Sequence, residues 1–158
     1  MAIRQIRYRE DEILTKKARL IENIDDKIKE LAQDMLDTMY KNDGIGLAAC
    51  QVGMLKSLVV YDVDYIDEKR PKKNPIVMIN PKITARSKTM VTVEEGCLSF
   101  PNVFENVERH EKVTVEYLDL NGKKHVKHAK GIEAICIQHE VDHLAGVVFL
   151  DYVKNKRK

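Results

Sequence analysis

The 158-residue sequence lacks several features that assign proteins to whole classes. It has no apolar run near the length of about 20 residues that a membrane-spanning helix needs. It has no excess of charge of one sign, since 27 basic residues stand against 25 acidic ones, so no long-range field points to nucleic acid. Residues 1–10 lack the apolar core of a secretory signal. We therefore expect a cytoplasmic protein that makes no membrane contact and has no specific nucleic-acid binding.

Cysteine is also scarce, and its pattern argues against a disulfide-stabilised protein. The three thiols, Cys50, Cys97 and Cys136, are odd in number and show no paired spacing. This pattern favours a reducing compartment, where thiols stay free or bind metal. There are no internal repeats, and the length suits a single hydrophobic core. We predict that residues 1–158 form one domain.

Residues 131–144 carry the strongest chemical signal, a His-Glu-x-x-His pattern made by His139, Glu140 and His143. On a helix, residues four apart lie on one face, so both imidazoles can hold one metal ion. Glu140 projects roughly 100° around the helix from His139. It is therefore poorly placed as a third ligand and well placed to act as a general base on a metal-bound water.

Helical spacing puts the two histidines on a stripe of otherwise apolar residues that we expect to be buried. The other members of the stripe are Ile132, Ile135 and Cys136. Two buried imidazoles need polar partners. They could be core histidines bonded to protein groups, but one metal ion satisfies both, and we favour the metal site.

A catalytic metal of this kind takes three protein ligands and a water, so one ligand must come from elsewhere. Cys136 and His143 are about 10 Å apart along the helix axis, too far for both to bind one ion. Cys136 is better interpreted as an apolar wall residue, and Asp142 points away from the stripe. Cys50 and Cys97 remain as candidates, each within a segment of small residues.

The periodicities along the chain predict an α+β fold, with mixed, largely antiparallel β-sheets packed around a central metal-binding helix. A helix is expected from Asn23 to about Lys41, with Asn23 or Asp25 as its cap. Residues 11–20 give a weaker helical signal. Asn121-Gly122 predicts a hairpin.

The predicted strands of that hairpin are residues 112–120 and 123–130. Four further strands are expected at residues 57–62, 76–79, 82–94 and 147–150. We expect Asn80-Pro81 to close the strand at 76–79.

Three segments together resemble the peptide deformylase family. They are Gly-Ile-Gly-Leu-Ala-Ala-Cys-Gln at 44–51, Glu-Gly-Cys-Leu-Ser at 95–99 and Gln-His-Glu-Val-Asp-His-Leu at 138–144. Their order and separations match the family over nearly the whole chain. The resemblance implies removal of the N-formyl group from the initiator methionine of newly synthesised polypeptides, with release of formate. The sequence departs from the family's pattern at Asn102, where glycine is common.

The resemblance also implies roles for individual residues. The metal ligands would be Cys97, His139 and His143. Glu140 would be the general acid/base, and the oxyanion donors would be the Gln51 side chain and the Leu98 backbone N–H. The substrate-binding residues would be Ile45, Gly46, Glu95, Ile132, Ile135 and Cys136.

The implied metal is Fe(II), for which Zn, Ni or Co can substitute. A thiolate from Cys97 would make the site softer than three imidazoles would. The implied partners are N-formylmethionyl nascent peptides and, transiently, the ribosome. For Gln51 a purely structural amide, bonded to a turn, is the competing interpretation.

Two other functions are compatible with the motif. One is a zinc peptidase that cuts ordinary peptide bonds, although the segment around Cys97 argues against it. The other is a metal-stabilised binding module without turnover, which would need a closed site with Cys50 or Cys136 as fourth ligand.

Overall fold

The computed structural model describes residues 2–65 and 72–153. Its helices are α1 (Asp26–Lys41) and α2 (Gly131–Leu144), and its 3-10 turns are η1 (Glu12–Thr15), η2 (Ala49–Val52) and η3 (Phe149–Tyr152). Five strands form one sheet in the order β1 (Gly46–Ala48), β2 (Leu58–Tyr61), β3 (Ile76–Arg86), β6 (Lys112–Leu118) and β7 (Lys124–Lys130). A second sheet pairs β4 (Met90–Cys97) with β5 (Phe100–His110).

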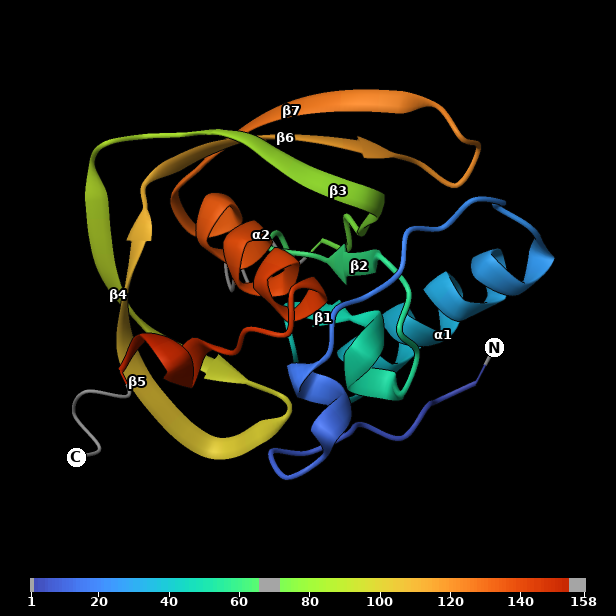
Figure 1. The fold of residues 1–158 in the computed structure, drawn as a ribbon, viewed down its shortest axis with the longest axis horizontal. Helices are drawn as coiled ribbons and strands as arrows, with labels where there is room; N and C mark the ends of the chain where they lie inside the picture. Colours follow the sequence, from blue (N-terminus) through green and yellow to red (C-terminus); the bar gives the residue numbers. More distant parts are fainter. Residues whose placement is uncertain (1, 66–71, 154–158) are drawn as a thin grey trace.

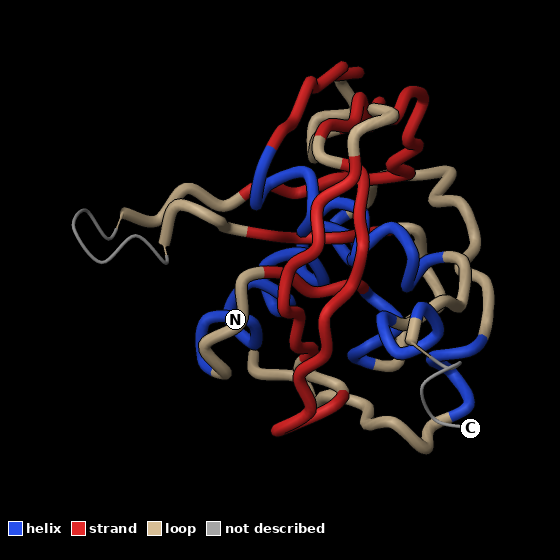
Figure 2. The backbone as a smooth tube through the Cα atoms, turned by 90° about the vertical axis from the view of Figure 1, so that its left-hand side faces the viewer, coloured by secondary structure: helices blue, strands red, loops and turns tan. Residues whose placement is uncertain are grey.

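Helix α2 lies in the middle of the molecule, with strands around it (Figure 1). It contacts β1, β2, β5, β6 and β7, whereas α1 packs against β1 and β2. Seen from the side of β4 and β5, long strands cross in front of the helices (Figure 2). All pairs of named strands are antiparallel, and the bridge between Arg19 and Lys56 is parallel. The predicted α+β class with a central helix is confirmed.

Strand β2 serves two apolar cores at once. Because side chains alternate along a strand, Val59 and Tyr61 join the core around α2, while Leu58 and Val60 join the core around α1. All four side chains are fully buried. The uninterrupted apolar run in the sequence therefore reflects a strand that is covered on both faces.

Local signals predicted α1 and the β6–β7 hairpin correctly. The Asp25 carboxylate accepts a hydrogen bond from the Ile28 N–H, which caps α1 one residue before its first turn. Lys112 lies opposite Lys130 and Leu118 opposite Lys124, with Asn121-Gly122 in the connecting turn. The turn is wider than predicted, because the Asp119 carboxylate accepts hydrogen bonds from two N–H groups within it.

Strand β3 runs through Asn80-Pro81, so the prediction that this pair ends a strand was wrong. The pairing with β6 shifts register between Ile79 and Lys82, which marks a bulge. Asn80 adopts φ 51° there, and its side-chain amide bonds to the Ile21 N–H and C=O. The proline therefore sits where the ladder is already interrupted.

Three other predictions of secondary structure were also wrong. Residues 82–94 are not one strand, because the chain turns between Arg86 and Met90, and β5 was not predicted at all. The segment at 11–20 forms only η1. Residues 147–150 are not a strand, because the Asp151 carboxylate accepts the Val148 N–H and closes the turn η3. Within the described residues, no helix combines the length and the apolarity that crossing a bilayer requires.

Candidate metal centre and active site

Helix α2 is buried around most of its circumference, and not only on one stripe. The apolar side chains of Ala134, Ile137 and Leu144 pack in the core on sides that the stripe does not include. By contrast, Ile132 is 49% exposed and Ile135 is half-buried. The prediction that these two isoleucines lie on a buried face was therefore wrong. The strands that surround α2 leave its N-terminal part open to a cleft.

Three potential ligand atoms come together beside α2. The Cys97 sulfur and one ring nitrogen from each of His139 and His143 lie within 4.8 Å of one another. The Cys97 Sγ is 3.4 Å from the His143 Nε2. Tetrahedral ligands that bind one ion at about 2.0–2.3 Å lie roughly 3.5 Å from each other. The spacing and the donor types therefore fit a divalent metal.

The His139 ring is held by a carboxylate from β4. Its Nδ1 donates to the Glu95 Oε1 over 2.9 Å, which leaves Nε2 with its lone pair free for a metal. Glu95 and Cys97 are two residues apart on β4, and although the pairing with β5 shifts register between them, both side chains reach His139. One strand thus supplies a candidate ligand and the group that orients another.

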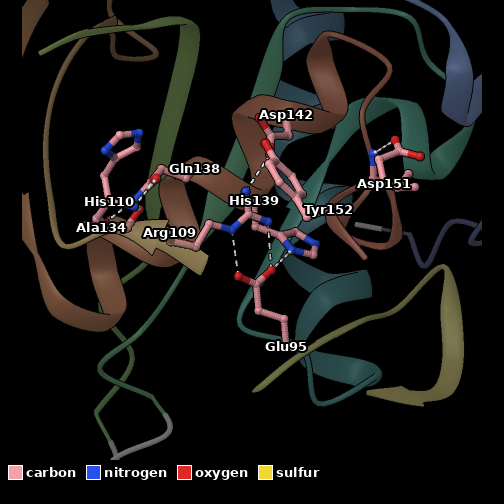
Figure 3. Close-up of polar contacts among 10 residues, drawn as sticks. Glu95, Arg109, His110, Ala134, Gln138, His139, Asp142, Asp151 and Tyr152 are labelled. Carbon is pink, nitrogen blue, oxygen red and sulfur yellow. Dashed lines mark hydrogen bonds and ion pairs between the residues drawn. The ribbon is translucent and has the colours of Figure 1, made fainter. Parts of the chain in front are cut away.

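Glu95 in turn forms a buried ion pair with Arg109 on β5. The guanidinium donates through Nε at 2.7 Å and Nη2 at 2.9 Å to the two carboxylate oxygens, as drawn in Figure 3. Burial alone would raise the pKa of Glu95, but the hydrogen bonds from Arg109 and His139 lower it to about 2. The carboxylate is therefore ionised at neutral pH and can only accept hydrogen bonds.

His143 lies deeper than His139 and is fully buried. Burial lowers the pKa of His143, so its imidazole stays neutral, the form that binds metals. Its Nδ1 has no hydrogen-bond partner among the described residues. The other ring nitrogen, Nε2, faces the Cys97 sulfur at 3.4 Å and is therefore the one placed to bind a metal.

Glu140 is buried but not paired. Its Oε1 has no hydrogen-bond partner among the described residues, and burial raises its pKa to about 7. A carboxyl group that titrates near neutral pH can both take and give a proton. On its other side, a Cβ atom added to Gly46 would lie only 2.5 Å from Glu140 Oε2. Residue 46 must therefore be glycine for Glu140 to keep this position.

The Gln51 amide combines the two interpretations that the sequence left open. Its Oε1 accepts the Ala48 N–H at the start of η2, which is the structural contact. This bond aims Nε2 toward the ligand set, where it donates to Cys97 Sγ at 3.4 Å and Ser99 Oγ at 3.1 Å. The amide N–H groups are thus fixed beside the candidate metal centre.

The other two cysteines do not join the ligand set. Cys50 donates to the His143 carbonyl, and burial raises its pKa to about 12. The Cys136 thiol faces the Ile45 carbonyl at 3.8 Å, and burial raises its pKa as well. Both are neutral thiols in the core. Of the two cysteines that spacing left open as third ligands, only Cys97 lies with the histidines.

A cleft of about 960 Å³ opens beside these groups. All the predicted site residues line it except His143. They are Ile45, Gly46, Gln51, Glu95, Cys97, Leu98, Ile132, Ile135, Cys136, His139 and Glu140. Several lining residues were missed from the sequence, among them Val91, Val93 and Val103, and Asn102 also lines the cleft. Asn102 adopts φ 63°, a left-handed conformation that explains why glycine suits this position.

Comparison with protein families gives a match along almost the entire chain. The family described as "Polypeptide deformylase" matches residues 3–158. The chain belongs to the peptide deformylase family. The deformylase of Finegoldia magna is 49% identical over 155 residues, covering 98% of this chain and 92% of its own length.

Solved deformylase structures share the fold. The crystal structure of the enzyme from Ehrlichia chaffeensis has a TM-score of 0.92 and 39% identity, and covers 99% of this chain and 91% of that one. A deformylase from Acinetobacter baumannii, described as "Met-ala-ser bound", has a TM-score of 0.89 and 34% identity. That match covers 96% of this chain and 98% of the other.

The protein is therefore a deformylase, a metal-dependent hydrolase that removes the N-formyl group from the N-terminal methionine of new polypeptides. The described residues contain the metal-binding group that such an enzyme needs. Neither the peptidase nor the non-catalytic module is favoured by these relatives.

Proposed function

We propose that Cys97, His139 and His143 hold the catalytic metal of this deformylase, and that Glu140 moves the protons of the reaction. One observation carries the proposal: the buried, unpartnered carboxylate of Glu140 lines the same cleft as Cys97 and His139, two members of the candidate ligand set. When bound, the metal supplies an activated water at neutral pH.

Glu140 is suited to both proton transfers of amide hydrolysis. It takes a proton from the attacking water and later delivers one to the departing amine. The absence of a hydrogen-bond partner at Oε1 leaves that oxygen available for the transfer. The pKa near 7 allows the residue to change protonation state within one catalytic cycle.

The formyl oxygen gains negative charge during the attack and needs fixed donors. We assign this role to the Gln51 Nε2 and the Leu98 backbone N–H. Gln51 is 1% exposed and anchored at its oxygen by Ala48, so its N–H groups need little reorganisation. This anchoring is what an electrostatic stabiliser requires.

The substrate side chain occupies the apolar part of the cleft. We assign its walls to Ile45, Gly46, Glu95, Ile132, Ile135 and Cys136. The relative described as "Met-ala-ser bound" supports a ligand that is a peptide beginning with methionine. Glu95 lines the cleft, but its main role in this proposal is to orient His139, because its carboxylate bonds to Arg109 and His139.

The natural metal in this proposal is Fe(II), with Zn, Ni or Co able to replace it. The soft thiolate and two imidazoles suit each of these ions. We further propose that residues 1–158 work as a single catalytic domain in the cytoplasm. There the enzyme meets N-formylmethionyl nascent peptides during transient contact with the ribosome.

The test compares formyl-Met-Ala-Ser with unformylated Met-Ala-Ser as substrates for metal-loaded protein. We expect formate release from the first and no cleavage of the second. Glu140→Gln should keep its metal while formate release falls by roughly 10²–10⁴-fold. Cleavage of the Met–Ala bond, or near-normal turnover by a metal-replete Glu140→Gln protein, would refute the proposal.

A further inference from the structure

We propose that Tyr152 and Asp142 are positioning residues for the metal ligand His139, acting through Arg109 and Glu95. The inference rests on the proposed ligand role of His139. Its basis is a chain of contacts that runs from the surface turn η3 to the buried ligand (Figure 3). Of these four supports only Asp142 falls within the His-Glu-x-x-His span, at a position where the pattern specifies no residue.

Arg109 is the centre of this network. It is 2% exposed, so its charge needs partners on every polar edge. One edge of the guanidinium meets Glu95, and the remaining Nη1 donates to Asp142 Oδ2 at 2.6 Å. The guanidinium is planar and rigid, so fixing Nη1 also fixes the edge that meets Glu95.

Tyr152 holds this arrangement in two ways. Its hydroxyl donates to Asp142 Oδ2 at 2.7 Å, the same oxygen that accepts from Arg109. The Arg109 Cζ also lies 4.7 Å from the centroid of the Tyr152 ring, a cation–π contact. The side chain thus locks the acceptor and covers the face of the cation.

The far end of the chain reaches the ligand itself. Glu95 Oε1 accepts from both Arg109 Nη2 and His139 Nδ1, each at 2.9 Å. The carboxylate cannot rotate without losing one of these bonds. The orientation of the guanidinium therefore sets the position of the oxygen that holds the imidazole.

The network also joins the two elements that carry the ligands. Glu95 lies on β4 with Cys97, and Asp142 lies on α2 between His139 and His143. Arg109, from β5, bridges the strand and the helix. Phe149, also in η3, lies with its ring centroid 5.9 Å from that of His139. The turn η3 therefore contacts His139 directly as well as through Arg109.

The test uses Co(II)-loaded protein, because cobalt absorption reports the geometry of its ligands. Tyr152→Phe removes the hydroxyl bond and keeps the ring, and Tyr152→Leu removes both contacts. Tyr117→Phe is the matched control, since that ring stacks on His125 in the β6–β7 hairpin and its hydroxyl has no hydrogen bond in the described chain. Rates of metal loss to a chelator are measured alongside the spectra and the kinetics.

Loss of outer partners of a metal ligand costs roughly 10–100-fold in metal affinity or activity. We expect metal loss about tenfold faster in Tyr152→Leu, less in Tyr152→Phe, and unchanged in Tyr117→Phe. The cobalt bands should shift in the same order, and kcat should fall while KM for formyl-Met-Ala-Ser stays constant. Spectra and release rates equal to wild type in both Tyr152 variants, even with lowered thermal stability, would overturn the inference. Failure of the wild-type protein to release formate would instead refute the proposed function, because the cobalt spectra do not depend on turnover.

Discussion

The β4–β5 and β6–β7 hairpins are both antiparallel, but they bury different kinds of side chain. The β6–β7 hairpin buries the apolar Val113, Val115 and Ala129, and carries its Lys124–Glu116 ion pair on an exposed face. The β4–β5 hairpin buries Glu95 and Arg109 as an ion pair. The β6–β7 hairpin follows the local sequence preferences for strands and turns, and it serves as scaffold. The β4–β5 hairpin departs from these preferences because it buries charged side chains, and it contributes residues to the proposed site.

The largest expected effect separates the two cysteines that line the cleft, Cys97 and Cys136. Cys97→Ala removes the ligand that β4 contributes, so metal content and formate release should fall by well over the roughly 10–100-fold that loss of an outer partner costs. Cys136→Ala should keep its metal and mainly raise KM, because its thiol lines the cleft. Metal analysis of both purified variants decides this. Loss of metal from Cys136→Ala alone would reverse the assignment.

Breaking one ion pair in each hairpin tests the comparison directly. Arg109→Met leaves the buried Glu95 and the partly buried Asp142 without their cation, and should lower the free energy of unfolding by roughly 3–5 kcal/mol. Lys124→Met breaks a solvent-exposed pair and should cause no measurable change. Denaturant unfolding of the two variants provides the measurement. Equal effects would show that the buried pair has no special role.

The turn of the scaffold hairpin should affect stability without affecting chemistry. Gly122 adopts φ 79°, and a Cβ there would meet only Ile24 Cδ1 at 3.8 Å. Gly122→Ala should therefore cost about 1–2 kcal/mol of conformational strain. Thermal unfolding should register this loss, and kcat for formyl-Met-Ala-Ser should equal that of wild type. A fall in kcat would connect this hairpin to the site.

The smallest effect is expected from shortening the chain after Val153. Val153 is 5% exposed and is retained, as is Tyr152. The five residues removed, 154–158, contain no apolar side chain that could dock. Steady-state kinetics should be unchanged. A clear drop in kcat would mean that these residues contribute to the site, in addition to η3.

The sequence predicted those parts of the fold whose signals are local. Asn121-Gly122 fixes a hairpin because its conformational preference is independent of the rest of the chain. Asn80-Pro81 carries a similar turn signal but lies within β3, where the Asn80 side-chain amide bonds to the backbone of Ile21, far away in the sequence. Local preference does not reveal whether such a dipeptide forms a turn that ends a strand or a bulge within one.

For the proposed site, helical spacing pointed to the two histidines and Glu140, and the family resemblance chose Cys97 from the two cysteines that spacing had left open. The supporting groups escaped detection because β5 was not recognised as a strand. Val107 and Arg109 are two residues apart and both buried, so alternation would have placed the arginine inward. Asp142 was expected to point away from the stripe that carries the histidines. Its carboxylate bonds to Arg109 and Tyr152. Only the structure joins these residues into one network.

The position of strand β2 between two cores has a consequence for how the protein unfolds. Because its alternate side chains belong to the core of α1 and to the core of α2, neither core can melt while the other stays intact. Backbone amides of Val59 and Val60 then exchange with solvent only when the whole chain unfolds. Fluctuations that admit substrates must arise at the rim of the cleft. We expect the two cores that share β2 to unfold as one cooperative unit.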